Sequence, residues 1–239
     1  MSLPLSAPLY RLRREARRLA RETSIPLHEA LDRVAATQGF ARWSLLVARH
    51  AAMPPAERLL AWLEPGDLLL IGARPGQGKT RLGLQLASLA ARRGGRAVFF
   101  TLEWDARTVV ERLRAQGADL AALAPRFEID DSPAISAAHI VARLADAPRG
   151  TLAVVDYLQL LDQKRSNPEL ATQIDQLAVF ARSRGVTLAF ISQIDRRYDP
   201  AAKPLPDIGD VRLPNPLDLA LFGKTCFLHG ERFSLREAA

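Results

Sequence analysis

Two kinds of hydrophobic pattern divide the chain near residue 54. Before that point, apolar residues recur every three or four positions in three short segments, which is the spacing of helices that bury one face. After it, short apolar runs alternate with longer helical patterns. Pro54 and Pro55 in "MPPAE" mark the boundary. The pattern therefore predicts a small helical module over residues 1–53 and a larger α/β domain over residues 54–239.

The N-terminal module is expected to consist of three short helices that close a small core around Trp43. In the first helix, apolar positions share one face, which consists of Leu9, Leu12, Ala16 and Leu19. Another face is basic and is formed by Arg11, Arg14, Arg18 and Arg21, with Arg13 and Arg17 beside them. This face fits a nucleic acid, the acidic surface of a partner protein, or plain solvent. A helix-turn-helix is an alternative interpretation of this module, although nothing in the sequence marks a recognition helix.

In the larger domain, the pattern predicts strands that alternate with helices. The expected strands cover residues 68–72, 96–102, 127–130, 151–156 and 186–192. The expected helices cover residues 79–93, 105–116, 136–146 and 168–184. This alternation indicates a mostly parallel sheet with helices on both faces. Residues 198–218 are expected to be a loop, and "GKTCFLHGERFSL" to be a C-terminal β-hairpin that turns at His229 and Gly230.

The amino-acid composition indicates what kind of partner the protein binds and in which cellular compartment it works. The formal net charge is +7 and the pI is about 10.3, which suits a nucleic acid or another anionic surface. Cys226 is the only cysteine, so the sequence excludes an internal disulfide and a cysteine zinc cluster, and a reducing cytoplasm is the simplest expectation. No run approaches the roughly 18 apolar residues of a membrane span, so we expect no membrane partner.

The strongest chemical signal is the segment "LLLIGARPGQGKTRLGLQLA", where a glycine-rich loop interrupts two apolar runs. The loop fits the phosphate-binding pattern [AG]-x4-G-K-[ST]. Its glycines let backbone N–H groups point at phosphate oxygens, and the following helix adds its positive end. We expect Lys79 to neutralise phosphate charge and Thr80 to bind Mg²⁺. The alternative is a chance glycine-rich turn. The predicted nucleotide-binding residues are Ala73, Arg74, Pro75, Gly76, Gln77, Gly78, Lys79, Thr80 and Arg81.

Three further polar residues end predicted strands, at the edge where open α/β sheets bind their ligands. Asp156 ends "TLAVVD" and is placed to hold Mg²⁺, unless it only caps a helix. Glu103, in "VFFTLEWD", can polarise the attacking water, or it can simply pair with an arginine. Gln193, in "AFISQIDRR", can contact the γ-phosphate, or it can be an ordinary polar strand end. Together with the loop, these residues predict an ATP site.

These segments resemble the ATPase domain of DnaB-type replicative helicases, within the RecA-like P-loop NTPase superfamily. The matching stretches are "GARPGQGKT", "TLEWDARTVVERL", "VVDYLQLL" and "ISQIDRR", which fall within residues 64–197. The resemblance implies a short variant of that family, with a RecA-like fold and with ATP and Mg²⁺ as cofactors. It implies Lys79 and Thr80 on nucleotide and metal, Glu103 as catalytic base, Asp156 as a metal ligand and Gln193 as γ-phosphate sensor. It also implies a homo-oligomeric ring, with a hexamer among the options, and single-stranded DNA in its pore.

The sequence departs from the family pattern in its last segment. In this family an arginine late in the domain reaches into the ATP site of the neighbouring subunit. Lys224 matches the lysine of a Lys-x-Arg pair, but Cys226 then stands where the arginine belongs. Arg232 or Arg236 could take its place, so Lys224 and Arg232 are the candidate trans-acting residues. The arginine-rich module at residues 9–52 does not resemble the family's N-terminal collar domain.

Candidate DNA contacts lie in two loops that face the pore in RecA-like rings. They are Lys164 and Arg165 after "DYLQLL", and Arg196 and Arg197 after "ISQID". Lysine and arginine contacts to the backbone would give salt-dependent, sequence-tolerant binding. For each residue alone, a solvated surface charge is nearly as good an interpretation.

Three hypotheses follow for the function. The first is an ATP-hydrolysing, DnaB-like helicase-type ATPase that acts on single-stranded DNA. The second is a RecA/KaiC-like regulatory or accessory ATPase with slow hydrolysis and no unwinding, which recruits a replication protein through residues 9–52. The third is a DNA-binding module with a vestigial nucleotide site, against which the presence of Lys79, Thr80, Glu103, Asp156 and Gln193 argues.

Overall fold

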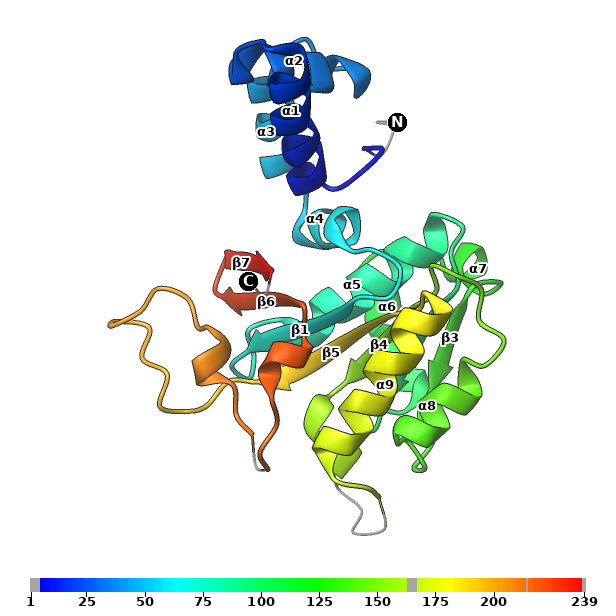
Figure 1. Cartoon of the computed structure of the whole chain (residues 1–239). Coiled ribbons are helices and arrows are strands. Elements are labelled where there is room, and N and C mark those ends of the chain that lie inside the picture. Colours follow the sequence, from blue (N-terminus) through cyan, green and yellow to red (C-terminus); the bar gives the residue numbers. More distant parts are fainter. Residues whose placement is uncertain (1–4, 163–166, 214, 238–239) are drawn as a thin grey trace. The chain divides into compact units, whose positions relative to one another are not determined.

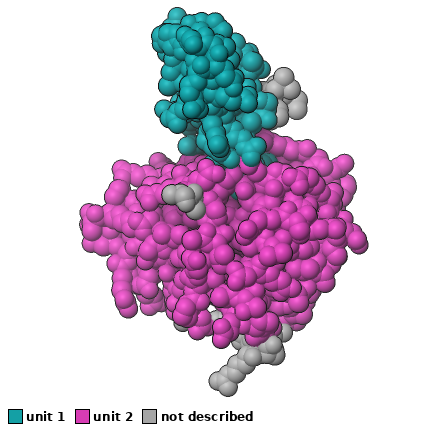
Figure 2. Space-filling model, in the orientation of Figure 1, with its two compact units in different colours: residues 1–63 teal, residues 64–239 magenta. Residues whose placement is uncertain are grey.

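The computed structural model describes residues 5–162, 167–213 and 215–237. The chain divides into two compact units, residues 1–63 and residues 64–239 (Figure 2). Sequence analysis expects this boundary at residue 54, ten residues earlier. The segment after Pro54 is instead a helix, α4 (Pro55–Trp62), which belongs to the first unit. The two prolines begin this helix, since proline at the first helical position costs no hydrogen bond.

The first unit contains the three helices that the pattern predicts, α1 (Leu9–Thr23), α2 (Leu27–Thr37) and α3 (Trp43–Ala51). Their core is made of small and aliphatic side chains, which are Leu12, Ala16, Ala30, Val34, Ala35 and Leu46. Trp43 is not at its centre: the indole is partly buried and packs against the core from one side. The backbone N–H of Trp43 donates to Oδ1 of Asp32 at 2.8 Å, which ties the start of α3 to α2.

The second unit is built on a seven-stranded sheet (Figure 1). Its strands are β1 (Leu68–Ala73), β2 (Ala97–Thr101), β3 (Phe127–Asp130), β4 (Leu152–Asp156), β5 (Thr187–Gln193), β6 (Lys224–His229) and β7 (Arg232–Glu237). They lie in the order β3-β2-β4-β5-β1-β6-β7. All neighbours are parallel except β6 and β7, which form the expected C-terminal hairpin. The predicted mostly parallel sheet is confirmed.

Helices cover both faces of this sheet (Figure 1). The main helices are α5 (Lys79–Arg92), α6 (Ala106–Ala115), α8 (Ala137–Arg143) and α9 (Leu170–Arg184), with a short α7 (Leu120–Leu123). On one face, apolar residues such as Leu70, Val155 and Phe190 pack against α8 and α9. On the other face, Gly83 brings α5 close to the sheet, because a Cβ there would lie 2.7 Å from Cδ1 of Ile191.

The irregular segments lie mainly after β4 and β5. Three 3₁₀ helices, which the hydrophobic pattern does not predict, occur at Leu158–Asp162, Ile208–Asp210 and Leu219–Leu221. Apart from the 3₁₀ helix at Ile208–Asp210, the described part of residues 198–218 forms the expected loop. An isolated antiparallel bridge between Ile194 and Val211 connects this loop to the end of β5. Among the described residues, no helix is long and apolar enough to span a membrane.

The strand order brings four predicted strand ends to one edge of the sheet. In the register, Ala73 of β1 lies opposite Gln193 of β5. Thr101, at the end of β2, lies opposite Asp156 of β4. Asp156 in turn lies opposite Ile191, two residues before Gln193. The carboxyl ends of β2, β4, β5 and β1 thus lie side by side, where a parallel sheet presents its ligand site.

Candidate nucleotide site

The phosphate-binding loop connects β1 to α5 as the sequence predicts. Gly76 and Gly78 have φ values of 78° and 81°, which residues with a side chain rarely adopt. Gly78 stands at the N-cap of α5 without a capping side chain, so the first N–H groups of the helix have no side-chain acceptor. A Cβ at Gly76 or Gly78 would meet no atom within 4 Å, so both glycines border open space. This geometry suits an anion at the helix N-terminus.

Lys79 and Thr80 begin α5, and both are buried although they are polar. The fully buried Asp156 lies close to both residues. Because of this proximity, Thr80 and Lys79 each act to lower the pKa of its carboxyl group. Among the described residues, neither carboxylate oxygen of Asp156 has a hydrogen-bond partner, so the Thr80 hydroxyl lowers the pKa of Asp156 without forming an aligned hydrogen bond. Asp156 therefore does not cap a helix, which was the alternative interpretation.

The carboxyl group of Asp156 has a pKa raised to about 7. Burial is the largest cause, because it removes water from the charged form, and repulsion from Glu103 is the second. A buried carboxylate with two unpaired oxygens beside a hydroxyl is a donor set for a hard divalent cation. Mg²⁺ typically uses one or two such protein ligands and takes its other ligands from water and phosphate. Thr80 and Asp156 therefore fit Mg²⁺.

Glu103 lies next to this pair. Its backbone N–H and that of Trp104 donate to Oγ1 of Thr101, at 3.2 Å and 3.3 Å, and Thr101 is the register neighbour of Asp156. The Glu103 side chain is exposed, and among the described residues it forms no ion pair with an arginine. Its charge is near enough to Asp156 to raise the pKa of that carboxyl group, which places Glu103 beside the candidate metal ligands.

Gln193 ends β5 beside the start of the phosphate loop. The N–H of Ile194 donates to the carbonyl of Ala73 at 3.1 Å, and the N–H of Arg212 donates to the carbonyl of Gln193 at 2.8 Å. Gln193 is partly exposed, so its amide is accessible from the loop. The preceding Ser192 is buried, and its hydroxyl accepts a hydrogen bond from Nε2 of Gln159 at 3.0 Å. Gln159, which belongs to "DYLQL", connects the segment after β4 to the end of β5, a role that sequence analysis missed.

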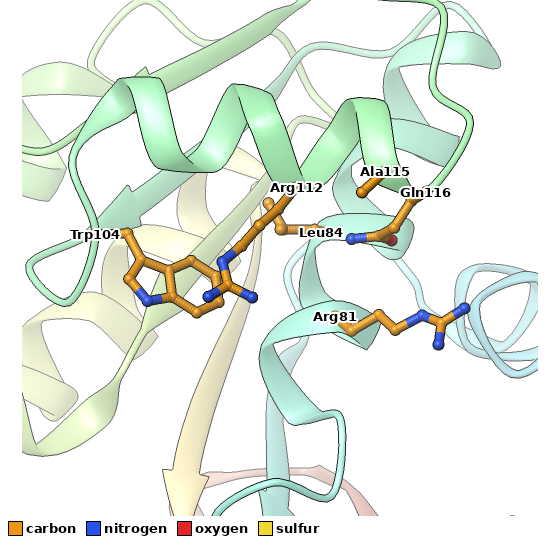
Figure 3. A pocket seen from close by; sticks show the side chains of 6 residues that line it. All are labelled: Arg81, Leu84, Trp104, Arg112, Ala115 and Gln116. Atoms are coloured by element: carbon orange, nitrogen blue, oxygen red, sulfur yellow. The ribbon is translucent and has the colours of Figure 1, made fainter.

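A shallow pocket of about 290 Å³ adjoins the site and contains two residues that sequence analysis also missed (Figure 3). The guanidinium carbon of Arg112 lies 3.7 Å from the ring centroid of Trp104. Arg112 is also close enough to Asp156 to lower its pKa. Arg81 and Leu84 of α5 line the same pocket, and in Figure 3 the Arg81 side chain points away from Trp104. In the sequence, the feature that could have indicated this contact is the tryptophan directly after Glu103.

Another residue of the loop, Gln77, forms a hydrogen bond with the C-terminal hairpin. The N–H of Gly230, in the turn between β6 and β7, donates to Oε1 of Gln77 at 2.7 Å. The strand before the loop also depends on this hairpin. A Cβ on Gly72 would lie 2.6 Å from Cε1 of Phe227, so only glycine lets the Phe227 ring of β6 lie against β1.

Lys224 does not have the expected role. Its ammonium group is buried and binds Oδ2 of Asp67 at 2.6 Å, where β1 begins, at the amino end of the parallel strands. It therefore lies at the edge of the sheet opposite the phosphate loop, with its charge held inside the unit. Cys226 is buried as well. Arg232 and Arg236 are exposed on β7, and Arg232 directly follows the turn that contacts Gln77.

The candidate DNA contacts are only partly visible. Lys164 and Arg165 lie outside the described residues. Arg196 and Arg197 are exposed just beyond the end of β5. Arg197 lies 4.0 Å from Asp195 and its side chain is 96% exposed, so this ion pair holds it only weakly. Both arginines therefore remain accessible to a polyanion near the ATP-site edge of the sheet.

Comparisons with known proteins agree with this geometry. Residues 53–126 match the family model of the DnaB-like helicase C-terminal domain. The chain is 26% identical over 188 residues to the replicative DNA helicase DnaB of Geobacillus stearothermophilus, covering 65% of this chain and 41% of that protein. It is 27% identical over 204 residues to DnaB of Pasteurella multocida, covering 70% and 44%. The chain thus spans about two fifths of the length of these curated relatives.

Solved structures show the same fold. One solved ATPase domain aligns with a TM-score of 0.57 at 19% identity, over 78% of this chain and 81% of that one. A DnaB-like replicative helicase, solved in a study of its interactions with primase, aligns with a TM-score of 0.60 at 18% identity, over 93% and 66%. The resemblance read from the sequence motifs is therefore confirmed: residues 53–126 are similar to the C-terminal domain of DnaB-like helicases, and the chain shares the fold of the solved ATPase domain and the solved helicase.

Proposed function

We propose that this chain binds and hydrolyses ATP with Mg²⁺ as a DnaB-like helicase-type ATPase. The observation that carries the proposal is Asp156. Its carboxylate is fully buried, has no partner for either oxygen, and lies beside Thr80 and Lys79 at the ligand edge of the sheet. Burying a carboxylate in this way is costly unless a ligand compensates it. A divalent cation bound at Asp156 and Thr80 would provide that compensation.

Each residue of the site then has a role that follows from its position. The N–H groups of residues 76–80 and the Lys79 ammonium hold the β- and γ-phosphates. Thr80 and Asp156 would hold Mg²⁺, which would supply positive charge to the phosphate oxygens. The Glu103 carboxylate accepts a proton from the attacking water, and the Gln193 amide contacts the γ-phosphate. Arg74 in the loop and Arg81 in the first turn of α5 add positive charge.

We further propose single-stranded DNA as the effector and a homo-oligomeric ring as the assembly. In support, the matched curated relatives are named as replicative DNA helicases. Arg196 and Arg197 are exposed and directly follow the strand that carries Gln193, so DNA bound there would be coupled to the γ-phosphate. A replication protein is a candidate partner through residues 9–52, since one similar structure is of a helicase studied for its interactions with primase.

One observation favours the second hypothesis, an accessory ATPase with slow hydrolysis. Lys224 is locked in an internal ion pair and Cys226 is buried, so the usual Lys-x-Arg element has no exposed counterpart in β6. An arginine supplied in trans accelerates phosphoryl transfer by about 10³ to 10⁵ in well-studied enzymes. The two hypotheses therefore differ in rate and in whether an exposed arginine of β7 completes the site of another copy.

Steady-state ATP hydrolysis with Mg²⁺, with and without single-stranded DNA, tests both proposals. The blank is Lys79→Ala, and the matched control is Arg92→Ala, which removes a positive charge from the other end of α5. Hydrolysis in the wild type and in Arg92→Ala, lost in Lys79→Ala, is the expected result. Hydrolysis that persists in Lys79→Ala would refute the assigned site.

The response to DNA separates the two hypotheses. Strong stimulation that is lost in Arg232→Ala or Arg236→Ala supports a helicase-type ring with an arginine acting between subunits. Mixing Lys79→Ala protein with Arg232→Ala protein should then restore part of the stimulated rate, because one intact interface can form. Slow hydrolysis that is indifferent to DNA, in a stable monomer, would refute the helicase proposal and leave the accessory ATPase.

A further inference from the structure

The strongest charge asymmetry of the chain lies outside the ATPase unit. Residues 1–63 contain ten arginines and no lysine against five acidic residues, so they hold +5 of the total formal charge of +7 in about a quarter of the chain. The ATP site does not use this charge, and the family model matches only from residue 53 onward. The charge therefore calls for a separate explanation.

Most of this charge lies on one face of α1. The buried residues of α1 are Leu12 and Ala16, which pack into the core of the first unit. Five exposed arginines, hereafter the α1 arginine face, lie on the side away from this core: Arg13, Arg14, Arg17, Arg18 and Arg21. At 1.5 Å per residue, they cover about 12 Å of helix length.

Within the described residues, the α1 arginine face is hardly neutralised by the protein itself. Arg18 lies 3.7 Å from Glu22 with both side chains more than half exposed, which is a weak surface pair. Arg21 donates from Nε to the carbonyl of Arg17, which leaves its charge uncompensated. Arg13, Arg14 and Arg17 have no ion pair in the described structure. Like charges four residues apart, such as Arg14 and Arg18, destabilise a helix, so the face costs stability unless an external anion binds it.

The surroundings of this face favour a polyanion over a protein partner. Among the described residues of the first unit, the exposed large apolar side chains are Leu27, Leu45 and Val47, which lie on α2 and α3 and not on α1. A protein interface needs an apolar, desolvated core, and the α1 arginine face offers none. Phosphate backbones, by contrast, are bound by arginine side chains without apolar contacts.

We propose that the α1 arginine face binds the phosphate backbone of duplex DNA without sequence preference. A helix with side chains is about 10–12 Å wide, which matches the major groove of about 12 Å. Sites for single strands usually offer exposed aromatic rings for stacking, and the aromatic residue of α1, Tyr10, is partly buried. The chain then holds duplex at the first unit, separately from any strand that the ATPase unit engages.

Fluorescence anisotropy of the full chain without nucleotide tests this proposal. The probes are labelled duplexes of about 20 base pairs with two unrelated sequences, and the single strands that form them, titrated between about 50 and 200 mM salt. The variant Arg14→Ala/Arg18→Ala/Arg21→Ala removes three charges from the face. The control Arg33→Ala/Arg42→Ala/Arg49→Ala removes the same charge from exposed positions of the same unit outside α1.

The expected result is specific to α1. The α1 triple variant should bind both duplexes about tenfold or more weakly than the control. The slope of log K against log salt should fall by about 0.9 for each lost phosphate contact, or about 3 in total. The variant Arg14→Lys/Arg18→Lys/Arg21→Lys keeps the charge and should keep most of the slope. Circular dichroism should show unchanged helix content in all variants, because the α1 triple relieves like-charge repulsion.

Several outcomes would overturn the proposal. Equal losses in the α1 triple and in the control would show that only net charge matters. Unchanged duplex binding in the α1 triple would remove the face from DNA binding and leave an acidic protein as its partner. Tighter binding of single strands than of duplex, lost in the α1 triple, would refute the duplex assignment. The rate of ATP hydrolysis without DNA should be the same in both triples. A chain without any ATPase activity would refute the proposed function and leave this test intact.

Discussion

Gln77 in the phosphate loop accepts a hydrogen bond from the backbone of Gly230, a residue 153 positions later in the chain. The bond connects the loop that receives the phosphates to the turn of the C-terminal hairpin. Arg232, the candidate for action on a neighbouring subunit, lies two residues beyond Gly230. The conformation of the loop and the position of this arginine are therefore mechanically linked, which makes the hairpin part of the nucleotide site.

Removing the hydrogen bond between Gln77 and Gly230 should lower the stability of the fold only slightly. It should weaken the binding of ATP more. Gln77→Met keeps the length of the side chain but removes the acceptor, so the free energy of unfolding should fall by about 0.5–1.5 kcal/mol. Affinity for ATP should fall as well, because the loop is held less firmly. Denaturant titration and nucleotide titration measure the two effects. Gln85→Met on α5 is the control, and an equal loss of ATP affinity there would contradict the link.

Glu103→Gln should separate binding from chemistry. The amide cannot accept a proton from water, so hydrolysis should fall by about 10²- to 10⁴-fold. Binding of ATP with Mg²⁺ should persist, because Lys79, Thr80 and Asp156 remain. Single-turnover hydrolysis and equilibrium binding measure this pair of effects. Glu111→Gln, on the exposed side of α6, should change neither; a normal rate in Glu103→Gln would assign the base elsewhere.

Asp156 should make the stability of the nucleotide-free protein depend on pH. The pKa of its carboxyl is raised from 3.8 to about 7, so between these values the folded state holds a proton that the unfolded state releases. The contribution of this group to stability is therefore complete below pH 4 and is lost as the pH rises to about 7. The total change is of the order of 4 kcal/mol.

Asp156→Asn isolates this effect. The variant has no carboxyl to ionise, so its free energy of unfolding should change less between pH 4 and pH 8 than that of the wild type. At pH 8 it should be the more stable of the two proteins without nucleotide, yet fail to gain stability from ATP with Mg²⁺. Thermal unfolding across pH, with and without the nucleotide, measures both. A wild type that gains stability up to pH 7 relative to the variant would refute the raised pKa.

Gly72→Ala should destabilise the fold just before the phosphate loop. Its methyl group would lie 2.6 Å from the Phe227 ring and 3.1 Å from Cδ1 of Ile194, an overpacking that typically costs about 1–3 kcal/mol. Phe227→Leu makes room, so the double variant should lose less than the sum of the two single variants. Gly223→Ala, where an added Cβ meets no atom within 4 Å, should be nearly neutral. Additive losses would contradict the contact.

Much of the ATPase unit follows from local sequence alone. The strand ends predicted at residues 102, 156 and 192 are correct within one residue, because each buried strand is an apolar run that stops at a polar residue. The phosphate loop is equally local: Gly76 and Gly78 need positive φ, and Lys79 follows directly at the start of α5. Backbone conformation and burial pattern are properties of neighbouring residues, so a single sequence reveals them.

Only the tertiary structure decided which of these residues meet. The order of the strands places Thr101 beside Asp156, and hence Glu103 near it, although the positions are more than fifty residues apart. It also pairs Lys224 with Asp67 at the far edge and links Gln77 to Gly230. These relationships depend on packing between distant segments, which neither hydrophobic period nor motif spacing encodes. The sequence by itself determined the chemistry of the site, and the packing of the sheet decided its geometry.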